Sequence, residues 1–316
     1  MKKMIKYTFL LSLCMLLFSN NKLNAQQEQM YSHYDYNSFA LNPAYAGSKR
    51  TLVANSLVRK QWVDFPGAPT YYNLGVHAPL IGDFAGGINI QTGTIGKFAV
   101  ASPISETQIA ASIAYNKKIT KDLRLAVGLR GGLYNYNFSL SKLQNVGNDN
   151  AFKNNDYNFN APMIGFGAYL YSEKFFVGLS APRMVFVPQN TVNNINIEYA
   201  AKTQFNFSAG YVIDVNDDIK LKPTTQVKVG SGIPVQVDLN LHAIYKDNYS
   251  IGAFYRTEGD IGIMATAAVS PSFTLVYSYD SKLKPLNTYI QGSHEFGLQY
   301  MIPYVANNRV RVPRYF

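Results

Sequence analysis

The sequence has 316 residues, of which 15% are charged and 14% aromatic, with 24 Tyr, 19 Phe and one Trp. A mean hydropathy of −0.10 is too polar for a bundle of membrane-spanning helices, while the charged fraction is well below the roughly one quarter usual in soluble domains. The formal charge of +10 falls to +6 without the four lysines of residues 1–25, and no Lys/Arg-rich run indicates a nucleic-acid surface. This composition favours a β-barrel with a lipid-facing outside and a polar inside.

Residues 1–25 have the features of a secretory signal peptide. A basic end precedes the apolar run 7–18, and Leu23-Asn24-Ala25 is a plausible cleavage sequence. The apolar run is too short to cross a membrane as a helix. Cys14, the single cysteine, lies within it, so the predicted mature chain has no disulfide, thiolate nucleophile or cysteine–zinc site. A lipoprotein site at Cys14 is a weaker alternative, because Leu13 precedes it where a small residue is expected.

Residues 26–50 form the next predicted unit, a polar and aromatic segment that ends in the turn signals Asn42-Pro43 and Gly47. If the strands that follow are even in number, both chain ends lie at the rim with short turns, so we expect this segment to start on the periplasmic side. Its exposed aromatic residues would favour folding into or across the lumen, with Asn42-Pro43 as a rigid corner. A periplasmic docking segment or a plain lead-in to the first strand are the alternatives.

Fourteen candidate strands follow within residues 51–301, the predicted barrel domain. Residues 235–245 are the plainest of them, because apolar and polar residues alternate over about ten positions, the length that a tilted strand needs to cross a bilayer. The candidates are 51–62, 70–77, 84–92, 105–116, 123–134, 163–171, 174–181, 203–215, 219–229, 235–245, 249–257, 261–269, 272–280 and 294–301.

The connections between these strands fall into two classes. Those after even-numbered strands are short, whereas those after odd-numbered strands are usually longer, the longest being 135–162 and 182–202. Short turns at one rim and long loops at the other are typical of outer-membrane barrels, while a β-sandwich has no reason to sort its loops in this way. The predicted fold is therefore all-β, an antiparallel transmembrane β-barrel of about 14 strands of the outer-membrane type, followed by a tail at 302–316.

Candidates for metal or catalytic chemistry are few. The four histidines have no metal-ligand spacing, and the aspartates near residue 216 fall on a tight turn where Asp is favoured anyway. These residues are His33, His77, His242 and His294, with Asp214, Asp217 and Asp218. We predict no metal, no cofactor and no catalytic set.

The charged residues on the inward face of the strands are more informative. If the alternation holds, six cations face the lumen together with three acids. They are Arg124, Arg130, Lys220, Lys222, Lys228 and Arg256, with Asp238, Asp280 and Glu295. One interpretation is a network that fills a polar barrel interior, and the other is a cationic lumen that grips an acidic segment or an anionic solute.

Several stretches match a known family in order and spacing. They are Leu41-Asn42-Pro43-Ala44-Tyr45-Ala46-Gly47, Arg59, Gln61-Trp62, Gly67-Ala68-Pro69, and the stretches IGAFYR at 251–256, YSYD at 277–280, SHEF at 293–296 and PRYF at 313–316. From about Gln29 to Phe316 the chain resembles the PorP/SprF family of type IX secretion proteins. Asn42, Pro43, Tyr45, Arg59, Trp62 and Glu295 therefore join the six cations as candidate lumen or partner-binding residues. Either Phe316 or the segment 296–300 would serve as the barrel-assembly signal.

The resemblance implies an outer-membrane component of the type IX secretion and gliding apparatus without enzymatic activity. The implied partners are outer-membrane lipid, other components of that apparatus, and a secreted adhesin that is exported or anchored through its C-terminal domain. The residues leave a second hypothesis open, a solute-conducting porin with a weakly anion-selective lumen, motivated by the excess of inward Lys and Arg. A third, an outer-membrane enzyme, has no convergent catalytic set to support it.

Overall fold

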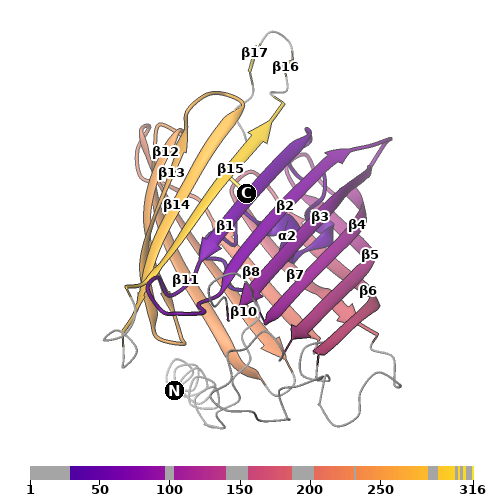
Figure 1. The fold of residues 1–316 in the computed structure, drawn as a ribbon. Helices are drawn as coiled ribbons and strands as arrows, with labels where there is room; N and C mark the ends of the chain where they lie inside the picture. Colours follow the sequence, from indigo (N-terminus) through magenta and orange to yellow (C-terminus); the bar gives the residue numbers. More distant parts are fainter. Residues whose placement is uncertain are drawn as a thin grey trace, which may run out of the picture.

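The computed structural model describes the barrel wall and a segment inside it (Figure 1). The described residues are 29–96, 103–139, 156–186, 203–230, 233–283, 291–302, 305–306, 309–310 and 315–316. Their strands are β1 (Val53–Lys60), β2 (Thr70–Pro79), β3 (Phe84–Ile95), β4 (Ile104–Lys118), β5 (Arg124–Ser139), β6 (Asp156–Tyr171), β7 (Phe175–Val185), β8 (Gln204–Tyr211), β9 (Ile213–Asp214), β10 (Ile219–Gly230), β11 (Ile233–Tyr245), β12 (Tyr249–Arg256), β13 (Asp260–Ala268), β14 (Phe273–Lys282) and β15 (Ser293–Met301).

These strands close into one antiparallel barrel. Consecutive strands pair along the chain, except that β8 pairs with β10, and β15 pairs with β1 to complete the ring. The short β9 continues β8 after Val212 and pairs with the same neighbour, β10, so the two make one wall strand. The barrel thus has 14 strands in the described chain, as predicted, and every predicted strand is present.

Several predicted boundaries are wrong; for example, β3 ends at Ile95 rather than at residue 92, and β7 ends at Val185 rather than at residue 181. The loop predicted at 135–162 is shorter, because β5 and β6 continue their pairing to Ser139 and Asp156. In this part of the hairpin Tyr and Phe alternate with Asn, but the aromatic side chains lie on the lumen face and the Asn side chains on the outer face, which reverses the apolar-outward pattern of the membrane-crossing part. The first strand ends at Lys60, and Trp62 lies beyond it with a positive φ of 51°, which an extended strand does not allow.

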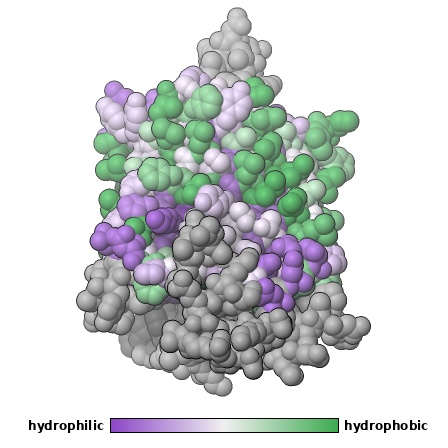
Figure 2. Space-filling model, viewed as in Figure 1, coloured by the Kyte–Doolittle hydropathy of each residue, from purple (hydrophilic) through white to green (hydrophobic). Residues whose placement is uncertain are grey.

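The wall has an apolar outer face and a polar inner face. On β5, Leu125, Val127 and Leu129 are exposed, whereas Ala126 and Arg130, which alternate with them, are buried toward the lumen. Figure 2 shows hydrophobic side chains gathered over the strands and hydrophilic ones near one rim. This band of exposed apolar side chains is the surface that membrane lipid covers in an outer-membrane barrel. In the described part of the chain, no helix is long and apolar enough to cross a membrane.

Residues 29–50, hereafter the plug segment, lie inside the barrel. The segment contains the one-turn helix α2 (Ser38–Leu41) and the 3₁₀ turn η1 (Pro43–Tyr45), and its aromatic residues Tyr31, Tyr34 and Phe39 are at most 2% exposed. Figure 1 shows α2 surrounded by the strands. The aromatic side chains that precede the first strand are therefore buried in the lumen.

The direction of the plug segment corrects one prediction. The Gln29 side chain donates to Glu106, near the start of β4 at the long-loop rim, whereas the Gly47 N–H donates to His77, near the end of β2 at the short-turn rim. The segment therefore enters at the long-loop rim and leaves at the short-turn rim, where β1 begins. The expectation of a periplasmic start is wrong, because it counted the wall strands and not this extra passage through the lumen.

After β15 the described residues of the tail form two small pieces. The two-residue strands β16 (Val305–Ala306) and β17 (Arg309–Val310) pair with each other, and Figure 1 shows them beyond the end of β15. Tyr315 and Phe316 then lie back in the lumen, where the Phe316 ring is 6% exposed. Phe316 is therefore not part of a wall strand.

Candidate functional site

The plug segment and the inner wall together form the candidate site. At the long-loop end, the Glu295 carboxylate on β15 accepts the backbone N–H groups of Ser32 and His33 at 3.0 and 2.8 Å. These two N–H groups lie outside any helix or strand, so a buried carboxylate satisfies donors that would otherwise lose hydrogen bonds to water. Glu295 thus binds the main chain of the plug segment rather than one of its side chains.

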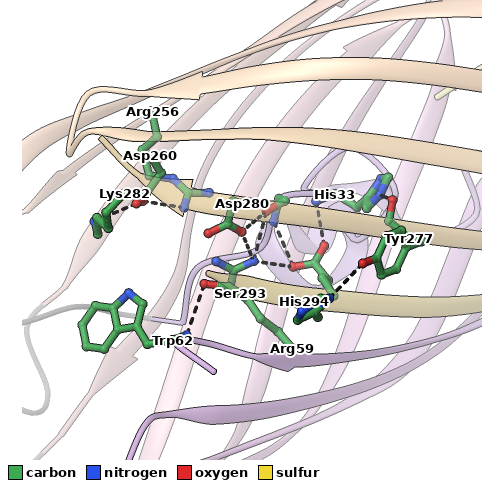
Figure 3. A network of polar contacts seen from close by, with 12 residues as sticks. His33, Arg59, Trp62, Arg256, Asp260, Tyr277, Asp280, Lys282, Ser293 and His294 are labelled. Carbon is green, nitrogen blue, oxygen red and sulfur yellow. Dashed lines mark hydrogen bonds and ion pairs between the residues drawn. The ribbon is translucent and has the colours of Figure 1, made fainter. Parts of the chain in front are cut away.

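A buried cation completes this contact. Arg59 Nη1 lies 2.7 Å from Asp280 and 3.6 Å from Glu295, and it donates to Ser32 Oγ at 3.1 Å. All three charged side chains are at most 3% exposed. Figure 3 shows Arg59 and Asp280 facing each other across the lumen side of β1 and β14. One guanidinium therefore balances two carboxylates while touching the plug segment.

A second group of buried charges lies beside the first, within the wall. Arg256 lies 2.9 Å from Asp238. Asp260 lies 3.2 Å from Arg256 and 2.9 Å from Lys282 (Figure 3). The pairs join β11, β12, β13 and β14 on their lumen side. Arg256 thus ties strands to one another, whereas Arg59 ties strands to the plug segment.

Near the middle of the lumen, Arg130 of β5 binds the end of α2. Its guanidinium donates to the carbonyl of Ala40 at 2.6 Å and to the carbonyl of Phe39, and it also donates to Ser112 Oγ at 3.0 Å. The last carbonyls of a helix have no partner within the helix. Arg130 of β5 supplies that partner.

The Asn42-Pro43-Ala44-Tyr45 stretch turns the plug segment toward the short-turn rim. The Asn42 carboxamide accepts the N–H of Ala44 at 2.9 Å, Pro43 begins η1, and Asn42 Nδ2 donates to the Ala168 carbonyl on β6 at 3.0 Å. The Tyr45 ring packs edge-on against Tyr169. Proline fixes φ and the asparagine caps the turn, so the corner is rigid and is bound to the wall.

A buried ion pair holds the other side of the plug segment. Lys222 Nζ lies 2.6 Å from Asp35 Oδ2, and His242 Nε2 lies 3.8 Å from the same oxygen. Burial alone would raise the pKa of Asp35, but Lys222, His242 and His33 hold it well below its ordinary value. Asp35 is therefore ionised at neutral pH, and the pair persists there.

The remaining candidate residues lie elsewhere. Arg124 and Lys220 are half-buried near the short-turn rim, where they donate to the Asn116 carbonyl and to Asp247. Lys228 is buried near the opposite end of β10. Trp62 lies in the β1–β2 connection, and its backbone N–H donates to Ser293 Oγ. The structure therefore brings seven candidates together around the plug segment or within it, namely Asn42, Pro43, Tyr45, Arg59, Arg130, Lys222 and Glu295.

Two kinds of site residue were missed from the sequence. Asp35 and Ser32 were not singled out, because nothing local distinguishes a lumen residue ahead of the first strand. Gly128 and Gly167 were also missed, although a glycine at an inward position of a strand often marks a close approach of another backbone. A Cβ on Gly167 would lie 2.1 Å from Asn42 Oδ1. Inward glycines are therefore the signal that could have located the contact.

Comparison with protein families now identifies the barrel. Residues 23–300 match the family described as type IX secretion system membrane protein PorP/SprF. The chain belongs to the PorP/SprF family. It is an outer-membrane β-barrel of the type IX secretion system, which places it among the other components of that system and in a membrane. The PorP/SprF family and the barrel fold belong to secretion and transport rather than to a known class of enzyme.

Other comparisons give weaker likenesses. No curated protein matches the chain. The outer membrane protein Omp33 of Acinetobacter baumannii is 7% identical over 81% of this chain and 100% of its own, with a TM-score of 0.46. The Pseudomonas putida toluene transporter TodX is 8% identical over 84% of this chain and 93% of its own, with a TM-score of 0.48. A KdgM porin is 11% identical over 79% and 99%, with a TM-score of 0.34. Likenesses this weak say nothing about what this PorP/SprF protein does.

Proposed function

We propose that this barrel is a plugged anchor of the type IX system, which holds or helps export a secreted adhesin through the adhesin's C-terminal domain. The observation that supports this most is the plug segment, which runs through the lumen from one rim to the other and is bound by Arg59, Glu295, Arg130 and Lys222. A lumen filled in this way is unsuited to solute flow. The two rims of the barrel are then the surfaces available for binding a partner.

The contacts of the cations weigh against the porin hypothesis. An anion-selective pore needs free cations along an open path. In the described part of the chain, Arg59, Lys222 and Arg256 instead pair with carboxylates, and Arg130 binds main-chain carbonyls. These pairings support the interpretation of the inward charges as a network that fills the lumen.

Deletion of the gene tests the proposal. The proteins on the cell surface should lose one or more large adhesins, and gliding should weaken. Reintroducing the intact gene should restore both, whereas a porin unrelated to secretion would leave the surface proteins unchanged. An unchanged surface proteome and unchanged motility, in a strain without a second gene of this family, would contradict the anchoring role.

A further inference from the structure

A cavity of about 420 Å³ lies at the short-turn end of the lumen, between the plug segment and the strands β10 to β15. Its mouth is formed by residues of the short turns, among them Asn248, Ser270 and Pro271. Volumes of about 300–1,000 Å³ are typical of sites for small molecules and short peptide segments. In an outer-membrane barrel the short turns face the periplasm, so this cavity opens toward the periplasm.

Two residues from the far end of the sequence form part of the cavity wall. The Tyr315 hydroxyl donates to Asp247 at 2.8 Å and accepts from Lys220 Nζ at 2.5 Å. The Tyr315 carbonyl accepts from Lys222 Nζ at 3.4 Å, and the Phe316 ring packs on Phe176 with 4.7 Å between centroids. We call Phe176, Lys220, Lys222 and Asp247 the aromatic slot.

The aromatic slot recognises several parts of a dipeptide at once. The Lys220–Asp247 ion pair binds the phenol hydroxyl. The Lys222 ammonium binds the main-chain carbonyl, and the Phe176 ring packs against the second aromatic ring. Lys222 joins the slot to the plug segment, since the same Nζ donates to Asp35 at 2.6 Å. Convergent polar groups beside an apolar pocket are the usual construction of a binding site.

A buried histidine lines the cavity beside the slot. His242 lines it and is 2% exposed, and its Nε2 has no hydrogen-bond partner in the described part of the chain. This nitrogen is covered by the protein and lies 3.8 Å from Asp35 Oδ2, so it faces the plug segment rather than the open part of the cavity. The cavity therefore adds room for a chain that continues past the slot, but no exposed imidazole nitrogen.

We propose that the aromatic slot and its cavity form a periplasmic site for a peptide segment that carries a Tyr-Phe pair. Tyr315 and Phe316 occupy the slot in this structure, and a partner segment of the same chemistry takes it in their place. The contacts use rings, a hydroxyl and a carbonyl, so a separate peptide can make them as well as the tethered one. The inference rests on the proposed function in one respect only, namely that the partner belongs to the type IX system.

The test uses a fluorescent peptide, Val-Pro-Arg-Tyr-Phe, blocked at both ends, and the detergent-purified barrel without Tyr315 and Phe316. Fluorescence anisotropy should show saturable binding to this variant. Binding to the full chain should be at least about tenfold weaker, because a tethered competitor has a high effective concentration. A peptide that ends in Gly-Gly should not bind either protein.

Two substitutions in the shortened barrel locate the site. Phe176→Ala should lower the affinity by about tenfold or more, since buried aromatic contacts dominate such interfaces. Phe207→Ala, on the exposed outer face of neighbouring β8, should leave it unchanged. Asp247→Asn lies on an exposed turn and should weaken binding several-fold even if the Phe176 variant fails to fold.

Equal binding of the Tyr-Phe and Gly-Gly peptides, or full affinity in both slot variants, would overturn the proposal. The outcome is separable from the proposed function. A barrel that binds the peptide but whose deletion leaves all surface proteins in place would keep this site and refute the anchoring role.

Discussion

Gly128 on β5 lies so close to Ala44 of the plug segment that no side chain fits between them. A Cβ placed on Gly128 would lie 2.4 Å from the backbone nitrogen of Ala44. Glycine is required here for the close approach of two backbones, on a strand where it otherwise weakens packing. The wall and the plug segment are shaped to each other at this point, which indicates a defined position for the plug segment.

Gly128→Val should therefore loosen the plug segment without harming the strand, because β-branched residues suit strands. We expect a loss of about 1–3 kcal/mol in the free energy of unfolding, as is usual for overpacking. Hydrogen exchange of residues 29–47 should become faster. Gly131→Val on the same strand is the control, since no atom lies within 4 Å of its added Cβ. Equal exchange in both variants would show that this contact does not hold the plug segment.

Arg59→Met should destabilise the barrel strongly, because it leaves Asp280 and Glu295 buried without their cation. Removal of one partner of a buried ion pair typically costs about 3–5 kcal/mol. Adding Asp280→Asn should recover part of the loss, because fewer charges are then uncompensated. Denaturant unfolding of the two single variants and the double variant measures the coupling. Strictly additive costs would mean that these residues do not act as one network.

Acidification from about pH 8 to pH 5 should strengthen binding of the plug segment in the Lys222→Met variant and leave it unchanged in the intact protein. The depressed pKa of Asp35 means that its contribution to plug binding is complete above the ordinary value of 3.8 and is lost only as the pH falls through the lower value. Burial is the largest influence on the pKa of Asp35 and Lys222 the largest that lowers it, so we expect the loss of Lys222 to let this pKa rise above its ordinary value. The ionised carboxylate of Asp35 then disfavours binding of the plug segment to the wall, and protonation of this carboxylate removes that cost.

Hydrogen exchange of the plug segment measures this difference. Between about pH 8 and pH 5 the intact protein should show no change in protection beyond the intrinsic pH effect on exchange. The Lys222→Met variant should be poorly protected at the upper end of this range and better protected at the lower end. Protection that falls with acidification in the variant would contradict the role of Lys222.

The direction of the plug segment is testable by labelling. The predicted mature chain has no cysteine, so Gln29→Cys introduces a single thiol near the long-loop rim, which faces the cell exterior in outer-membrane barrels. A membrane-impermeant maleimide carrying a short linker should label it in intact cells. Asn248→Cys, on a short turn, should react only after the outer membrane is permeabilised. The reverse pattern would place the start of the plug segment on the periplasmic side.

The wall of this barrel could be predicted from the sequence because its outer face meets lipid and its inner face does not. Leu125, Val127 and Leu129 alternate with inward residues, and this local pattern survives without any knowledge of contacts. The path of the plug segment could not be predicted in the same way. Asn42 binds a carbonyl 126 residues away, and Ser32 binds a carboxylate 263 residues away. No periodicity encodes such pairings.

Conductance in a planar lipid bilayer tests most directly whether the plug segment closes the lumen. The intact protein should insert and stay electrically silent, whereas a variant without residues 29–39, which retains the wall strands, should show steady conductance. Heat-modifiable migration on gels should confirm that both proteins form barrels. Steady conductance from the intact protein, equal to that of the shortened one, would contradict a plugged anchor and favour a porin.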